Sequence, residues 1–535
     1  DILPDEATNA DVTARFPDMY WYQGQRILRK ALAIGKHPRL FPVLLSNFSC
    51  GPDSFILSYF EELAKDKPYL ILELDEHGSA TGYQTRIEAF LDMVAHAGAA
   101  RRPAAAVHPS RIRYDMAGMR GKRLWIPQIH PYIPDLWAAM LRHHGYDARA
   151  LGAETQAHCD LGRSFCRGSE CLPAALTIGK FIDNVKDSPH EDVLIMPRAN
   201  GPCRYGQYAT LHSRILERVG LEKAQILSPT SADGYAFFTP EITRAAWKTA
   251  CLGDMLYKLR CRSVPYHTNR ALAERLFDNA LAELCRVIEQ GGDWRGLVRD
   301  LVRRLQREID YRGPRKPLVG IVGEIFVRLN RFSNQDITQV IEAAGAEAWL
   351  SPMSEWCLYV AELLTHAAGP LARARTLLYR AYLHHIEGMA HKGFAPLLAG
   401  LKEPPIHRVL EQGSRFLPIA FEGESILTLG RAKLFADSGA SLIVNCAPFG
   451  CMPGRITAYI FQNNPHIFTA PIVNLFFDGT GDNASRVRLY LESIVQDQIE
   501  RRRRDVSPFH TIFPSPSARA TAEDRRPDAE RRPEV

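Results

Sequence analysis

The segment Ile443–Pro453 has the sequence IVNCAPFGCMP, a short apolar run that leads directly into a loop with cysteine, glycine and proline. A helical pattern follows, then a second apolar run at Pro471–Phe477 and another helical pattern from Ala484 to about Arg502. Short apolar strands that alternate with helices are typical of parallel sheets with right-handed crossovers. The segment therefore predicts a Rossmann- or flavodoxin-like lobe, in which ligands bind at the carboxyl ends of the strands.

The same alternation extends along most of the 535 residues, which are too many for one ordinary domain. We expect an α/β protein with two to three such lobes, parallel sheets and helical insertions. The predicted parts are the end of a first lobe at 1–97, a linker at 98–118, a middle lobe with a helical end at 119–312, a C-terminal lobe at 313–500 and a disordered basic tail at 501–535.

The segment around Cys50 resembles the segment around Cys451. Leu44–Pro52 reads LLSNFSCGP, so both copies consist of a strand, an aromatic residue, a small residue, cysteine, one more residue and proline. Arg86 lies 36 residues after Cys50, and Arg486 lies 35 residues after Cys451. We interpret these segments as two copies of one lobe ending. Because the first copy lacks its beginning and residue 1 is not methionine, we expect the C-terminal part of a longer polypeptide.

Four cysteines lie in loops at strand ends or helix starts: Cys50, Cys171, Cys203 and Cys451. A helix N-terminus favours a thiolate, and nearby glycines let the backbone approach an inorganic cluster and donate hydrogen bonds to it. The pattern is compatible with an iron–sulfur cluster and equally with buried structural thiols. Zinc is less favoured, because paired CxxC motifs and nearby histidines are absent from the sequence.

The other seven cysteines are weaker candidates or core residues. Cys251, Cys261 and Cys285 fall in helical patterns, where a free cysteine usually packs as a small apolar residue. Cys159, Cys166, Cys357 and Cys446 are secondary candidates for ligands.

Several strings resemble motifs of the 2-hydroxyacyl-CoA dehydratase superfamily, in particular of the large proteins related to acyl-CoA dehydratase activases. The resemblance covers about residues 20 to 500, although related proteins usually carry a residue other than cysteine at the position of Cys166. The strings are Asn47–Phe55, Asp75–His77, Gly168–Pro173, Gly201–Tyr208, Gly323–Asn330, Ser354–Trp356 and Pro448–Gly454.

In that superfamily, dehydratase subunits bind a [4Fe–4S] cluster through three cysteines, and a separate ATP-hydrolysing activase supplies one electron. The resemblance implies that Cys50, Cys171, Cys203 and Cys451 hold a [4Fe–4S] or related cluster. It also implies an activase-type ATPase as partner, either separate or N-terminal in the full polypeptide, and an acyl-CoA or other small molecule as substrate. ATP binding within this chain is not expected, because Gly320–Gly323 resembles a strand end more than a phosphate loop.

Two hypotheses follow. The first is a redox enzyme component related to dehydratases, for which Glu324, Arg328 and Glu355 are weak catalytic candidates. Glu324 and Arg328 follow a predicted strand. There they either contact a substrate or form a salt bridge with each other. Glu355 begins a predicted helix. The second is a non-catalytic scaffold or electron-transfer partner whose cluster is structural.

The charge pattern argues against a nucleic-acid partner. The net charge is +6, but Arg501–Arg504 and further arginines lie in the last part of the chain beside proline, serine and glutamate. The rest of the chain is close to neutral. Neither a membrane span nor a signal peptide is recognisable in the sequence, so we expect a cytoplasmic protein with reduced thiols.

Overall fold

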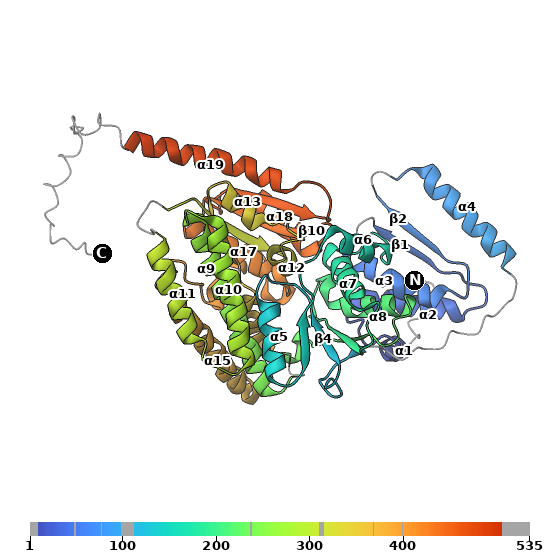
Figure 1. Ribbon diagram of the computed structural model, residues 1–535. Helices are drawn as coiled ribbons and strands as arrows, with labels where there is room; N and C mark the ends of the chain where they lie inside the picture. The colour runs from blue at the N-terminus through green and yellow to red at the C-terminus, as the bar shows by residue number, and fades with distance from the viewer. Residues whose placement is uncertain are drawn as a thin grey trace, which may run out of the picture.

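The computed structural model describes residues 9–47, 50–75, 78–97, 112–235, 238–309, 315–367, 369–398 and 400–505. Within them, three all-parallel sheets of two, five and four strands are flanked by helices (Figure 1). The chain is a mixed α/β protein with Rossmann- or flavodoxin-like lobes, which confirms the predicted fold class. No described helix is long and apolar enough to cross a membrane.

The N-terminal part is built on a pair of parallel strands. Residues of β1 and β2 pair in register from Val43 and Leu70 to Asn47 and Leu74. Among the described residues, β2 is the only strand paired with β1, and alternate side chains of β1, Val43 and Leu45, are exposed. The elements are α1 (Asn9–Arg15), α2 (Tyr22–Lys36), β1 (Val43–Asn47), α3 (Gly51–Ala64), β2 (Leu70–Leu74) and α4 (Ala80–His96).

The middle lobe has its four main strands in the spatial order β5-β4-β6-β7, with β3 beside β7. This is the flavodoxin-like order, in which the second strand along the chain lies beside the first, and the third lies on the first strand's other side. The elements are β3 (Ile112–Arg113), β4 (Arg123–Ile126), α5 (Ile133–His143), β5 (Asp147–Ala150), α6 (Gln156–Ser164), α7 (Leu172–Val185), β6 (Asp192–Ile195), η1 (Arg204–Gln207), α8 (Tyr208–Arg218), β7 (Gln225–Leu227) and η2 (Ser231–Asp233).

The C-terminal lobe repeats this order with β9-β8-β10-β11. The strand order therefore reverses between β4 and β6 in the middle lobe and between β8 and β10 here; we call these two places the switch points. The elements are β8 (Leu318–Gly323), α12 (Ile325–Leu329), α13 (Ile337–Ala343), β9 (Glu347–Leu350), α14 (Ser354–Ala367), α15 (Pro370–Phe394), α16 (Ile406–Gly413), η4 (Ile419–Phe421), α17 (Glu424–Asp437), β10 (Leu442–Pro448), α18 (Met452–Asn463), β11 (Ile472–Phe477) and α19 (Ala484–Asp505).

A group of long helices connects the two complete lobes. They are α9 (Pro240–Ser263), η3 (Val264–Tyr266), α10 (Arg270–Glu289) and α11 (Arg295–Glu308), and α9 and α11 both contact α15 (Figure 1). Buried residues of these helices belong to the same apolar core as residues of β8, β10 and β11. The helices therefore share a core with the C-terminal lobe and with α5 and α7 of the middle lobe, while the strands of the middle lobe's sheet pack into separate apolar clusters.

Some predicted segments differ from the structure. Within the predicted middle lobe, the segment before Cys171 contains a helix, α6, and the helical end is divided into α10 and α11 at Gly291 and Gly292. Helix α19 continues to Asp505, which is inside the segment predicted as a tail. The remainder of that tail and most of the predicted linker, 98–111, lie outside the described residues.

Candidate functional site

Each sheet places one cysteine after an equivalent strand. Cys203 follows β6 and Cys451 follows β10, which are the third strands of the middle and C-terminal lobes and border their switch points. Cys50 follows β1, which pairs with β2 as β10 pairs with β11. The repeat predicted from the sequence is therefore present in the fold. Ligands of parallel α/β sheets bind at this edge, next to the switch point.

All four predicted ligands are N-cap residues with extended backbone: Cys50 of α3, Cys171 of α7, Cys203 of η1 and Cys451 of α18. A proline in the first turn begins each of the three α-helices, at a position where its missing N–H is not needed. The sulfur of Cys203 accepts a hydrogen bond from the Tyr205 N–H at 3.5 Å, and that of Cys451 from the Gly454 N–H at 3.4 Å. Helix starts and N–H donors of this kind stabilise thiolates.

The buried side chain of Arg204, the residue after Cys203, bonds to the segments that carry the other three predicted ligands. Its Nη1 donates to the carbonyl oxygen of Ser169 at 2.9 Å and to Oγ of Ser54 at 3.3 Å, and its Nη2 donates to the carbonyl oxygen of Phe449 at 3.3 Å. One guanidinium thus holds loops that are far apart in the sequence.

The acceptors of Arg204 adjoin the other predicted ligands. The two carbonyl groups lie two residues before Cys171 and Cys451, and the hydroxyl lies in the first turn of the helix that Cys50 caps. A Cβ at Gly51 would lie 3.5 Å from the carbonyl oxygen of Gly450, so the two copies of the repeat meet here. The structure therefore brings the turns that carry all four cysteines around one arginine.

Burial raises the pKa of all four thiols, and the Arg204 guanidinium partly offsets this rise for Cys50, Cys171 and Cys451. Without a metal these thiols are therefore protonated at neutral pH. Thiolates are the form that binds iron, so loading of the site releases protons.

Cys171 is held by a buried tyrosine. Its sulfur lies 2.6 Å from Oη of Tyr208, the first residue of α8. The Tyr208 ring stacks on Phe55 of α3, with ring centroids 5.9 Å apart. Helices from the N-terminal part and the middle lobe therefore both fix the position of this thiol.

An apolar cavity of about 190 Å³ opens at the strand ends of both complete lobes. Its lining includes Ile126 and Ile195, the last residues of β4 and β6, and Glu324, the residue after β8. Aromatic and aliphatic side chains of α5, α9 and α14 contribute to the wall, and Cys203 also lines it. Cys203, a predicted cluster ligand, thus borders a cavity that reaches the switch points of both lobes.

A second cavity, of about 540 Å³, has both polar and apolar walls and borders the loop before Cys171; we call it the polar cavity. Three guanidinium groups and three carboxyl groups line it, those of Arg86, Arg163, Arg167, Glu73, Glu170 and Asp478. The cysteine-bearing turns are therefore bordered by one apolar and one polar cavity.

Glu324 lies at the apolar cavity opposite a second carboxyl group, Glu424. Glu324 caps α12, with Oε1 accepting from the Phe326 N–H at 3.1 Å and Oε2 from the Val327 N–H at 2.9 Å. Glu424 accepts from the Ile325 N–H at 3.0 Å through Oε1, while its buried Oε2 has no hydrogen-bond partner among the described residues. Burial raises the pKa of both carboxyl groups, and repulsion from Glu324 raises the pKa of Glu424 further.

Glu324 is a residue that the sequence predicts for the site, whereas Glu424 and Arg204 are not. Glu424 comes 100 residues after Glu324 and begins a helix of ordinary composition, so no local pattern marks it. In the structure, Glu422 has φ 57° and ψ 175°, a conformation that residues other than glycine rarely adopt.

Arg328 donates to backbone carbonyls. Its Nη1 bonds the Gly323 carbonyl at 2.6 Å, its Nε that of Ser351 at 3.2 Å and its Nη2 that of Pro352 at 3.3 Å. This buried side chain thus ties together the ends of β8 and β9, next to the switch point.

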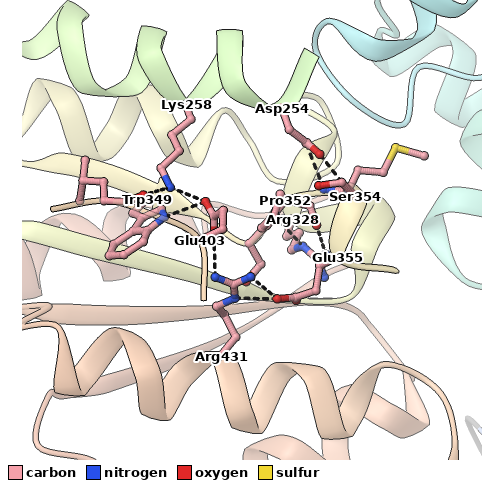
Figure 2. A network of polar contacts seen from close by, with 12 residues as sticks. Asp254, Lys258, Arg328, Trp349, Pro352, Ser354, Glu355, Glu403 and Arg431 are labelled. Atoms are coloured by element: carbon pink, nitrogen blue, oxygen red, sulfur yellow. Dashed lines mark hydrogen bonds and ion pairs between the residues drawn. The ribbon is translucent and has the colours of Figure 1, made fainter. Parts of the chain in front are cut away.

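Glu355 belongs to a buried network on α14, and it is not part of the cavity lining (Figure 2). Its Oε2 accepts from Nε of Arg431 at 2.7 Å, and Nη1 of Arg431 donates to Glu403 at 2.5 Å. Glu403 also pairs with Lys258. The network joins α9, α14 and α17 and holds its charges in compensating pairs.

The remaining cysteines are distributed over the lobes. Cys251 and Cys261 are buried in α9, and Cys285 lies on α10 against the same core. Cys166 lines the polar cavity and Cys357 the apolar one.

Within the described residues, no three His, Cys, Asp or Glu side chains lie close enough to hold a single metal ion. A cubane spreads its ligand sulfurs over roughly 6–7 Å, because each sulfur binds a different iron, so a cluster needs a wider group than one ion does. Cysteines on four separate turns around Arg204 are the donor set that suits such a group. No protein-family model matches the chain, and no curated protein is significantly similar to it.

Proposed function

We propose that this chain is an iron–sulfur protein related to the 2-hydroxyacyl-CoA dehydratases, which takes part in ATP-activated single-electron reduction of an acyl-CoA or another small molecule. The observation that carries the proposal is the gathering of four N-cap cysteines, three of them after equivalent strands, around the Arg204 guanidinium. Independent structural thiols have no need for this shared arrangement.

In this proposal Cys50, Cys171, Cys203 and Cys451 hold the cluster, which supplies one low-potential electron when bound. Arg204 balances part of the thiolate charge and keeps the turns in register. The apolar side chains of the cavity exclude water from the side of Cys203, where the small molecule binds. Because Cys203 lines this cavity, we favour a redox component over a purely structural cluster.

The proposed partner is an activase-type ATPase that delivers the electron. The polar cavity beside the Cys171 loop offers it an approach, since guanidinium and carboxyl groups both line it and a charged protein surface can pair with each of them. Neither a nucleic acid nor a membrane is part of the proposal.

The proposal predicts that protein purified without oxygen is brown, with broad absorbance near roughly 400 nm and matching amounts of iron and acid-labile sulfide. Metal and sulfide analysis checks this result. Colourless protein that contains stoichiometric zinc would contradict it. A redox titration with and without acyl-CoA then separates the two roles, because a substrate shifts the potential of a catalytic cluster and leaves that of a distant structural cluster unchanged.

A second prediction concerns Arg204. Arg204→Met removes donors that organise the cysteine turns, and loss of such supporting contacts typically lowers metal affinity about 10–100-fold. The variant is expected to lose its cluster correspondingly faster to a chelator, followed by the decay of absorbance. Arg214→Met is the matched control: Arg214 bonds α3 from α8, through Ser58 and Glu62, but makes no bond to a cysteine turn. Equal cluster lifetimes in the two variants would argue against the role of Arg204.

A further inference from the structure

The apolar cavity carries an inference about what it binds. Its two carboxyl groups, Glu324 and Glu424, lie at the end that Cys203 also lines, and the rest of the wall is mainly apolar. The indole N–H groups of Trp137, Trp247 and Trp356 point to other acceptors, namely the Ala246 and Leu383 carbonyls and Oη of Tyr235. Most of the wall therefore offers a ligand contact area without polar groups.

One polar atom at the carboxyl end lacks a hydrogen-bond partner among the described residues. Both oxygens of Glu324 and Oε1 of Glu424 accept backbone N–H groups, whereas Oε2 of Glu424 is buried and without a hydrogen-bond partner in the described part of the chain. Glu424 as a whole is only 5% exposed. A buried polar group without a partner costs about 1–3 kcal/mol, and a ligand that bonds to it recovers that cost.

We propose that this cavity binds an uncharged, largely apolar molecule of about the size of one substituted aromatic ring, hydrogen-bonded at its polar end to Oε2 of Glu424. The size follows from the volume of about 190 Å³, since an apolar protein cavity of about 150 Å³ accommodates benzene. This proposal depends on the proposed function in one respect only, namely that the molecule bound in the cavity is the substrate of the cluster.

Electric charge on the ligand is disfavoured at this place. An ion that enters an apolar cavity loses its hydration. A hydroxyl or amide end avoids this cost. Such an end, placed at Oε2 of Glu424, lies on the side of the cavity that Cys203 lines.

The test uses three probes of similar size: benzyl alcohol, toluene and benzoate. Tryptophan fluorescence of the purified holoprotein follows binding, because Trp137, Trp247 and Trp356 line the cavity. Benzyl alcohol is expected to bind saturably and about tenfold more tightly than toluene, in line with one recovered hydrogen bond, and benzoate at least about tenfold more weakly than benzyl alcohol.

Two variants make the test specific. Glu424→Leu is expected to remove the preference for benzyl alcohol over toluene, while Ala361→Leu, which fills space at the wall, weakens both probes. Absence of saturable binding, or an unchanged preference in a folded Glu424→Leu variant, overturns the proposal. Iron and sulfide measured on the same samples keep the two proposals apart: iron without probe binding refutes only the cavity, and probe binding without iron refutes only the cluster.

Discussion

The Cys203→Ser variant is expected to purify without oxygen as an almost colourless protein, with its cluster iron lost. Cys203 is the N-cap of η1, its sulfur lines the apolar cavity, and its neighbour Arg204 bonds the turns before Cys171 and Cys451. A serine hydroxyl is a far poorer ligand for iron than a thiolate, because it remains protonated near neutral pH. Iron and sulfide analysis with absorbance near roughly 400 nm measures the effect.

Cys285→Ser is the control for this variant. Cys285 lies in the second half of α10, partly buried against the helical core and outside both cavities. The Cys285→Ser variant is expected to keep its full iron content. If Cys203→Ser keeps as much iron as Cys285→Ser, then Cys203 is not a ligand, even if other cysteines hold a cluster.

Arg431→Met is expected to lower the free energy of unfolding by about 3–5 kcal/mol, the usual cost of breaking a buried ion pair from one side. Arg431 is only 1% exposed and bonds Glu355 and Glu403 (Figure 2). Lys258 still pairs with Glu403 in the variant, but Glu355 is left as an uncompensated buried charge. Thermal and urea unfolding, monitored by circular dichroism, measure the change.

Arg408→Met serves as the matched control on the surface. Arg408 and Glu411 form an exposed pair one helical turn apart, with 61% and 59% of their side chains exposed. Such pairs contribute at most about 1 kcal/mol, so this variant is expected to unfold close to the wild type. If the Arg431 variant unfolded at the same midpoint as the control, the buried network would have no net role in stability.

The strands of the fold could be predicted because their signals are local. The run before Gly323 and the run before Cys451 are apolar, short and bounded by glycine or proline, and they form β8 and β10. Helix α6 was missed because only Cys159 and Gly162 of its residues are buried. Two small buried residues do not make the apolar stripe by which an amphipathic helix is recognised.

The site could be predicted only in part, for the same reason. A cysteine directly after a strand or before a helix is visible in the sequence, and four such positions were selected. The role of Arg204 depends on Ser54, Ser169 and Phe449, which come from different parts of the chain and become neighbours only when the lobes dock. The position of Glu424 likewise depends on its hydrogen bond from the Ile325 N–H, about a hundred residues away in the sequence, which no local pattern encodes.

The sheet of the N-terminal part has a consequence for the behaviour of the protein in solution. Within the described residues, β1 pairs with another strand on one side only. Its side chains Val43 and Leu45 are 46% and 61% exposed. On α4, Leu91 and Met93 are 57% and 50% exposed. An open strand edge beside apolar side chains is a template for another strand, including the same strand of a second molecule. Within the described residues, this edge is therefore a place where a further strand can pair with β1.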